Sequence, residues 1–419
     1  MNLSGRKNTL IVLLDQLVVS GSNFITGFLL ARFLGAEGYG QYVLAYGFLL
    51  FVSGLQVAVV ISPMMITGPK LEAQESKAYY RSLFTLQMIF NLIAGGGVYL
   101  LGSTIGDIYP EWNIAGLAMP LAAATICFLT QDYFRRYFIA NHQSGVALFN
   151  DILFHGFRVI SLVYIGHYLE LNSDLAFRIL VISSFIPFVV GATSIYTSKG
   201  YTKDVRNYKA IFIEQWHFGK WLIANNLSYW GSNQLVIYMV AALVSVASVG
   251  AMNAALNVVG VTNILYLALE NIVPMRATQL YKVYGLNGLN RYLVKVSLVG
   301  GGLTAAIVIV ACVWAEEWMS LLYDNKFSGY SWIIYGWALC YFIGFFHRPL
   351  NAGLKVLDDT KGIFISNMIN PLIAMTCGYW AISNYNVLGA LFVLCVMNGM
   401  IMIMLFLRYR ARVKYLKAR

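Results

Sequence analysis

The sequence predicts an all-α polytopic membrane protein with about 12 transmembrane helices, arranged as two six-helix bundles related by a pseudo-two-fold axis. Three observations support this prediction: an apolar composition, a series of long apolar stretches, and a hairpin that recurs at half the chain length. Hydrophobic residues make up 59% of the 419 residues and charged residues only 11%. A soluble domain carries about 25% charged residues, so a soluble fold of this size could not bury so much apolar surface.

Each apolar stretch is about 20 residues long or longer, which is the length that a helix needs to cross the hydrocarbon core. The connections between them are short, so no soluble catalytic domain is expected on either side of the membrane. The predicted spans are 9–34, 39–62, 80–103, 114–138, 145–168, 175–197, 217–244, 249–275, 291–315, 330–350, 362–383 and 386–408.

Basic residues, Arg135 and Arg136 among them, are concentrated in every second connection and in the C-terminal tail, whereas the connections between them hold Lys326 as their one central cation. By the positive-inside rule this alternation places both termini in the cytoplasm and supports an even number of spans. The net charge of +11 is therefore interpreted as a topology signal, and no nucleic-acid partner is expected.

The hairpin at Gly21–Tyr46 aligns without a gap with Gly231–Leu256, and Gly21-Ser22-Asn23 then matches Gly231-Ser232-Asn233. A repeat at half the chain length suggests that the molecule consists of two related halves. The basic connection 198–216 is the natural joint between them. The predicted domains are an N-terminal bundle, 1–205, and a C-terminal bundle with a basic cytoplasmic tail, 206–419.

Three ionisable residues lie within the fifth span. Asp151, His155 and Arg158 have i, i+4, i+7 spacing, which puts them on one face of a helix. A charge near the centre of a span costs about 2.5–3.5 kcal/mol, so it usually faces a cavity or a partner. Two interpretations stay open: Arg158 binds phosphate oxygens in a polar lumen, or the three residues form an internal Asp–His–Arg ladder that satisfies itself.

Other charged residues lie nearer the ends of spans. Asp15 is interpreted as a proton or sodium ligand, as the partner of a cation such as Arg158, or as a carboxylate that reaches the interface. Arg32 either extends to the lipid headgroups or lines an outer vestibule. Glu270 either pairs with Arg276 at the interface or binds a coupling ion. Asp15, Glu270 and Asp151 are therefore the candidates for coupling to H⁺ or Na⁺.

Polar faces also occur on several spans, including Asn233 on the seventh and Asn257 on the eighth, and they predict a central polar cavity shared by the two halves. The sequence contains no GxxxxGK[ST], HExxH or GxSxG motif. No CxxC pair occurs, and the acidic pair Asp358-Asp359 is expected in a solvated loop. No catalytic residue, metal site or organic cofactor is therefore predicted, and the protein is expected to be a transporter and not an enzyme.

Short motifs resemble those of a known family. Ala31, Arg32, Leu34 and Gly35, followed by Tyr39 and Gly40, match an Ala-Arg-x-Leu-Gly turn with a following Tyr-Gly. FRRYFIANHQ after the fourth span, NAGLKVLDDTKG before the eleventh and NVLGALFV opening the twelfth add to the likeness. In these features the chain resembles the polysaccharide-biosynthesis (Wzx-type) flippases of the multidrug/oligosaccharidyl-lipid/polysaccharide exporter superfamily.

The resemblance implies a V-shaped pair of six-helix bundles in a bacterial cytoplasmic (inner) membrane, working by alternating access. The implied substrate is an undecaprenyl-pyrophosphate-linked oligosaccharide, moved to the outer leaflet for the assembly of O-antigen of lipopolysaccharide, capsule or exopolysaccharide. A polysaccharide polymerase and a chain-length regulator are implied partners. The pyrophosphate is expected at Arg158, with His155 and Arg32, and sugars at Asn233 and Asn257.

Two other functions remain open at this point. A cation-coupled multidrug-type exporter of the same superfamily would need acidic residues in its lumen. A membrane polysaccharide polymerase or ligase acting on the same lipid carrier usually has a long loop on the outer side, and the outer connections of this sequence are short.

Overall fold

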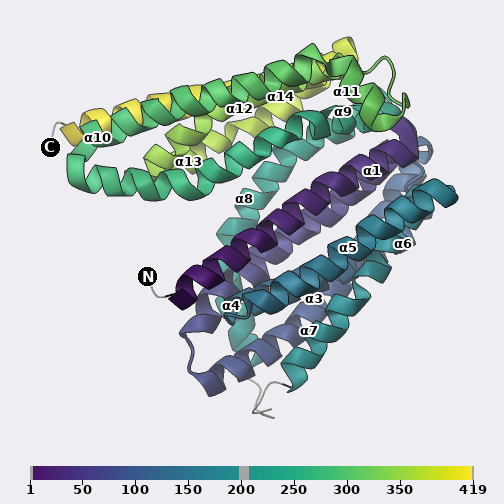
Figure 1. The fold of residues 1–419 in the computed structure, drawn as a ribbon, viewed down its shortest axis with the longest axis horizontal. Coiled ribbons are helices and arrows are strands. Elements are labelled where there is room, and N and C mark those ends of the chain that lie inside the picture. The colour runs from purple at the N-terminus through teal and green to yellow at the C-terminus, as the bar shows by residue number, and fades with distance from the viewer. Residues whose placement is uncertain (1–2, 198–206, 418–419) are drawn as a thin grey trace. The chain divides into compact units, whose positions relative to one another are not determined.

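The computed structural model describes residues 3–197 and 207–417, and every regular element in these ranges is helical (Figure 1). The all-α prediction is therefore confirmed. The chain forms two compact units, Met1–Leu227 and Ser228–Arg419, whose division lies inside helix α8. The predicted domain boundary at 205/206 lies just before α8. It falls among residues 198–206, which are outside the described part.

The N-terminal unit is built around α1, α4 and α5. α1 packs along α5 and α3 packs along α4, while α4 also contacts α6 and α7. The elements of this unit are α1 (Leu3–Gln56), η1 (Val57–Ile61), α2 (Ser62–Thr67), η2 (Gly68–Lys70), α3 (Ala73–Ile108), η3 (Pro110–Trp112), η4 (Ala115–Leu117), α4 (Ala118–Ala140), α5 (Ser144–Tyr168), α6 (Ser173–Ser183), α7 (Phe185–Thr197) and the first part of α8 (Tyr208–Leu243).

In the C-terminal unit α12 is the central helix, because it packs against α9, α10 and α14. Two short helices, α11 and α13, precede and follow it. The elements are the second part of α8, α9 (Val246–Val259), η5 (Gly260–Thr262), α10 (Asn263–Val313), α11 (Ala315–Tyr323), α12 (Ile333–Val356), α13 (Thr360–Asn367) and α14 (Ile369–Lys417).

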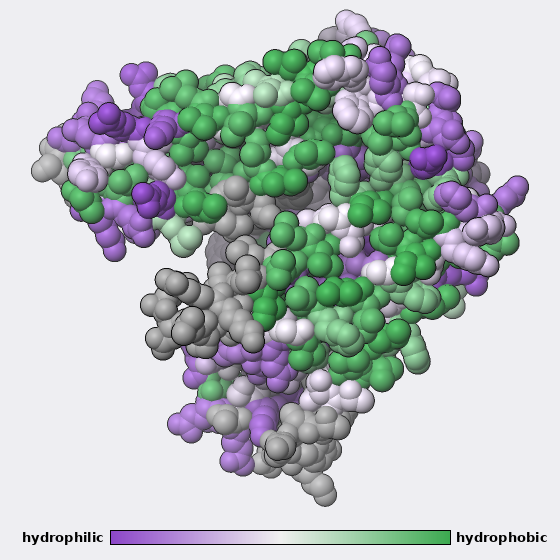
Figure 2. All heavy atoms as spheres, in the orientation of Figure 1, coloured by the Kyte–Doolittle hydropathy of each residue, from purple (hydrophilic) through white to green (hydrophobic). Residues whose placement is uncertain are grey.

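By length and apolar composition, eight helical stretches among the described residues could cross a membrane. Two of them, Leu14–Lys70 and Lys361–Lys417, have 57 residues each and contain a turn, at Gly35 and Asn386, so each holds two predicted spans. The predicted spans 217–244 and 330–350 lie largely on α8 and α12, although α12 begins only at Ile333. Much of the surface in view is hydrophobic (Figure 2), as lipid contact requires.

Two predicted connections are largely helical. The stretch 276–290 belongs to α10 and is interrupted at Gly285, and α8 begins at Tyr208, before the predicted start at 217. The reason is physical: an apolar window marks the part of a helix that lies in hydrocarbon, whereas the hydrogen-bonded backbone can continue into the polar interface.

Three sharp turns inside long helices have the same kind of backbone. Gly35 has φ 71° and ψ −175°, Gly285 has φ 62° and ψ −153°, and Asn386 has φ 52° and ψ −132°. Positive φ combined with extended ψ is almost confined to glycine. In the repeat alignment Gly35 meets Ser245, which caps α9 by accepting a hydrogen bond from the Ser248 amide, so a turn occurs at both positions.

Replacing Gly35 with alanine is expected to lower the free energy of unfolding by about 1–3 kcal/mol, because the new Cβ must adopt this backbone conformation. Gly21 is the matched control, since it lies within α1 and a Cβ there meets nothing within 4 Å. Gly21→Ala is expected to be neutral or mildly stabilising. Unfolding by SDS titration of the purified protein measures both variants, and equal losses in the two would contradict the account of the turn.

The start of α8 belongs to the N-terminal unit because it packs into an aromatic core. Tyr79, Tyr133 and Phe134 are fully buried there. The Gln215 side chain of α8 donates a hydrogen bond of 2.8 Å to the hydroxyl of Tyr79. Gly219 lets α8 approach the backbone at Ala58, whose carbonyl oxygen would lie 2.8 Å from a Cβ at this position.

Candidate functional site: a buried polar core in the N-terminal unit

The polar core lies where α1, α4 and α5 meet. The buried residues of α5 recur every three or four positions and include Asp151, His155 and Arg158, so the face predicted from their spacing points into the unit. Each of these helices is apolar enough to span a membrane. Charged groups at such a position need partners inside the protein.

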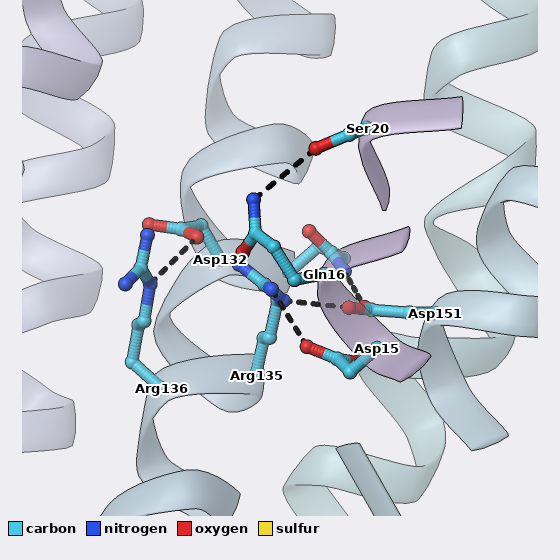
Figure 3. Close-up of polar contacts among 8 residues, drawn as sticks. Asp15, Gln16, Ser20, Asp132, Arg135, Arg136 and Asp151 are labelled. Atoms are coloured by element: carbon cyan, nitrogen blue, oxygen red, sulfur yellow. Dashed lines mark hydrogen bonds and ion pairs between the residues drawn. The ribbon is translucent and has the colours of Figure 1, made fainter. Parts of the chain in front are cut away.

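The first layer of the core is an ion-pair triad, with Arg135 of α4 between two carboxylates (Figure 3). Its Nη2 donates to Asp15 Oδ2 of α1 at 2.7 Å, and its Nε donates to Asp151 Oδ2 of α5 at 2.6 Å. The Gln131 amide donates to the other oxygen of Asp151 at 2.8 Å. The side chains of Arg135, Asp15 and Asp151 are 9%, 2% and 0% exposed. The triad therefore ties three helices together, close to the connection between the end of α4 and the start of α5.

The charges of the triad do not cancel when both carboxylates are ionised. Two carboxylates and one guanidinium sum to −1, and a single proton held by the pair makes the sum zero. One oxygen of Asp15, Oδ1, is buried and has no hydrogen-bond partner among the described protein groups. Two neighbouring buried carboxylates share a proton and titrate as a pair, so the triad has the groups to take up one monovalent cation.

Arg135 is the site residue that the sequence pattern does not reveal, because the positive-inside rule places it with Arg136 in a cytoplasmic connection. The structure separates their roles: Arg136 pairs with Asp132 of the same helix at 3.3 Å, with its side chain 35% exposed, whereas Arg135 points into the core (Figure 3). The available signal was that Gln131 and Arg135 lie four positions apart on one helical face.

Two predicted pairings are wrong. Asp15 is the partner of a cation, as one interpretation predicted, but the cation is Arg135 and not Arg158. The internal Asp–His–Arg ladder on α5 is also absent from the described residues, since Asp151 bonds to α4 and Arg158 bonds to α1. Both errors have one cause: spacing along a helix identifies a shared face but not the side chain on the neighbouring helix that meets it.

The second layer of the core is centred on Arg158, which is 5% exposed. Its Nε donates to Thr26 Oγ1 and its Nη2 donates to Asn23 Oδ1, each at 3.2 Å, and both acceptors belong to α1. Its Nη1 has no hydrogen-bond partner among the described protein groups. Both hydrogen-bond partners of this guanidinium are neutral, so its charge is not compensated by an ion pair.

Further unsatisfied polar atoms lie on the same helix. The side-chain amide of Asn150 and the Nδ1 atom of His155 are buried without a protein partner in the described structure. Most buried polar atoms in folded proteins are hydrogen-bonded. Such atoms on α5, together with Arg158 Nη1, give this helix the means to bind a polar ligand.

The other predicted site residues are placed as follows. Arg32 is half-buried just before the turn at Gly35. Asn233 and Asn257 belong to the C-terminal unit, on α8 and α9. Glu270 pairs with Arg348 of α12, and the predicted pair with Arg276 is therefore wrong. The guanidinium of Arg348 also lies 3.8 Å from the centre of the Tyr266 ring.

The expected solvated loop is correct for Asp358, which is exposed, and wrong for Asp359, which is buried. Asp359 caps α13 by accepting from the Gly362 amide and bonds to Arg408 Nε at 2.7 Å. The hydrogen bond from Arg408 lowers the pKa of Asp359 below its usual value. Among the described residues no group of three or more His, Cys, Asp or Glu side chains could hold a metal ion.

No family model and no curated protein sequence matches the chain, but solved structures do. The inward-facing conformation of a multidrug resistance MATE family transporter of the MOP superfamily aligns with a TM-score of 0.77 at 13% identity, covering 98% of this chain and 99% of that one. The outward-facing conformation of such a transporter aligns with a TM-score of 0.62 at 13% identity, covering 99% and 96%.

A MOP superfamily transporter from Pyrococcus furiosus, described as having a binding pocket of reverse polarity, aligns with a TM-score of 0.56 at 13% identity, covering 99% of this chain and 96% of that one. At this level of identity the likeness establishes the fold. The chain has the two-bundle fold of MATE transporters, and the predicted fold class is confirmed.

Proposed function

We propose that the protein is a flippase that moves polyprenyl-pyrophosphate-linked oligosaccharides across a bacterial cytoplasmic membrane by alternating access. The two-bundle fold, shared with solved transporters in inward-facing and outward-facing conformations, supports the transport part of the proposal. The chemistry of the polar core supports an anionic substrate.

The observation that carries the proposal is the uncompensated charge of Arg158. The triad balances Arg135 with carboxylates, whereas Arg158 bonds to a hydroxyl and an amide and keeps one nitrogen without a protein partner. An unpaired buried charge costs several kcal/mol. A pyrophosphate removes that cost, because a guanidinium binds phosphate oxygens through two parallel hydrogen bonds.

The triad is proposed as the coupling site. Binding of one proton or Na⁺ to Asp15 and Asp151 neutralises the surplus negative charge and weakens the hold of the carboxylates on Arg135. Because the three residues come from α1, α4 and α5, a change in this charge alters the contacts that join these helices. The same rearrangement reaches Arg158, whose partners Asn23 and Thr26 also belong to α1.

A second candidate function is the export of cationic compounds. It is favoured by the two buried carboxylates and by the multidrug transporters among the solved structures. The two candidates differ in the sign of the charge that the core offers to a substrate. Both carboxylates are bound to Arg135 and leave one net negative charge, which is enough for a proton or Na⁺. Arg158 has no carboxylate partner, so the core offers a substrate a positive charge.

Deletion of the gene in the host distinguishes the two functions. The flippase proposal predicts loss of surface polysaccharide, restored by the plasmid-borne wild-type gene, with unchanged susceptibility to a panel of cationic drugs and dyes. Normal polysaccharide together with increased drug susceptibility would reject the flippase and establish the exporter.

A further inference from the structure

The C-terminal unit contains a cavity of about 1000 Å³ that is separate from the polar core described above. It lies between the two legs of α10, residues 263–284 and 286–313, with Phe345 of α12 at its floor. The turn at Gly285 joins the legs. Gly300 packs directly against Phe345, because a Cβ at this position would lie 2.4 Å from the Phe345 ring.

The walls of the cavity are apolar and exposed at the surface of the unit. Ile272, Val299 and Leu303 line it and are 58%, 57% and 51% exposed. From Arg291 to Leu303 the second leg rises about 18 Å at 1.5 Å per residue. This matches one leaflet of a hydrocarbon core that is about 30 Å thick, so an acyl chain of the bilayer fits along the wall.

One end of the cavity is basic. Arg276, Arg291 and Lys295 line it, no acidic residue does, and no ion pair joins these cations to a carboxylate among the described residues. Arg291 and Lys295 lie four positions apart, where like charges on a helix repel each other. In Figure 2 hydrophilic side chains cover the end of this unit where α10 turns, and hydrophobic ones cover the surface beside it.

We propose that this cavity binds an anionic phospholipid of the cytoplasmic leaflet, with its phosphate against Arg276, Arg291 and Lys295 and an acyl chain along the legs of α10. Charge complementarity identifies the occupant: three cations without acidic neighbours, at the membrane side that the positive-inside rule assigns to the cytoplasm, fit a lipid phosphate. The exposed apolar walls favour a bilayer lipid over a water-soluble phosphate. The inference is independent of the proposed function.

Native mass spectrometry of the full-length protein from mixed micelles tests the proposal, with phosphatidylglycerol and phosphatidylcholine as competing probes. The wild type is expected to retain one phosphatidylglycerol with a preference of about 100-fold, the factor that three surface cations give on an anionic lipid. The variant Arg276→Gln/Arg291→Gln/Lys295→Gln is expected to lose this preference. The matched control is Lys282→Gln/Lys355→Gln/Lys361→Gln, which changes three exposed cations of the same unit that do not line the cavity. This control is expected to keep the preference for phosphatidylglycerol.

A second variant tests the acyl part of the site without changing charge. Leu303→Trp fills the apolar end and is expected to reduce retention of phosphatidylglycerol while leaving the three cations intact. Equal retention of the two lipids by the wild type would overturn the proposal. An unchanged preference for phosphatidylglycerol in the variant without the three cavity cations would also overturn it. The same holds if inorganic phosphate displaces the lipid, or if the protein retains polyprenyl phosphate in place of phosphatidylglycerol.

Discussion

Replacing Arg135 with methionine is expected to destabilise the N-terminal unit by about 3–5 kcal/mol, the cost of removing one member of a buried ion pair. The variant leaves Asp15 and Asp151 buried without the cation to which both are bound. Their mutual repulsion then acts between α1 and α5, two helices that pack along each other. The free energy of unfolding by SDS titration in detergent micelles measures the loss.

Arg136→Met is the matched control, because it changes the same residue type one position further along α4. Arg136 is 35% exposed in its side chain and pairs within its own helix, so the expected loss is below about 1 kcal/mol. A loss for Arg135→Met as small as that of the control would contradict the triad.

A triple variant that removes all three charges of the triad distinguishes its effect on stability from its effect on ion coupling. In Asp15→Asn/Arg135→Gln/Asp151→Asn all three charges are removed together, and amides can replace the hydrogen bonds. Replacing a complete buried ion-pair group is often neutral or stabilising, so stability is expected to return toward that of the wild type. Ion coupling is expected to stay lost, because no carboxylate remains to take up the ion. A neutral triad that still transports against an ion gradient would place the coupling site elsewhere.

Arg158→Gln is expected to slow substrate transport by at least about 30-fold, the factor that corresponds to 2 kcal/mol, the lower end of the cost of truncating a buried charged hydrogen-bond partner. Glutamine retains a donor for Asn23 or Thr26 but offers a pyrophosphate no positive charge. The amount of surface polysaccharide, in cells that carry only the variant, measures the effect at matched levels of membrane-inserted protein.

Two further variants define the role of Arg158. Arg178→Gln removes an arginine of the same unit whose side chain is 62% exposed and paired with Asp174, and it is expected to leave polysaccharide levels unchanged. Arg158→Lys keeps the charge but loses the planar group that bonds two acceptors at once, so an intermediate rate is expected. Normal polysaccharide with Arg158→Gln would remove Arg158 from the substrate site.

The sequence was sufficient to predict the fold because the bilayer imposes strong rules. Backbone groups in hydrocarbon must bond within their own segment, so each long apolar stretch had to be helical, and the turn at Gly35 followed from a glycine-rich interruption. The helix ends were harder to predict. α10 continues through 276–290 with one break at Gly285, because polarity marks where the hydrocarbon ends and not where the helix ends.

The candidate site was predictable only within one helix at a time. The spacing of Asp151, His155 and Arg158 correctly predicted one buried face of α5. The residues that bond to that face come from α1 and α4. They are far apart in the sequence, as Asp15 and Arg135 are, so no local sequence pattern connects them. A cation at the end of an apolar stretch also suits the interface, so the sequence pattern does not separate Arg135 from Arg136.

Purified protein in vesicles shows whether this fold moves a lipid-linked oligosaccharide whose anionic group binds Arg158. The substrate is a polyprenyl-pyrophosphate-linked oligosaccharide confined to the inner leaflet, and a membrane-impermeant glycosidase outside reports its arrival. The wild type is expected to make the oligosaccharide accessible at least about 30-fold faster than Arg158→Gln, and to leave a cationic dye untransported. Wild-type vesicles that move the dye and leave the oligosaccharide protected would contradict the account.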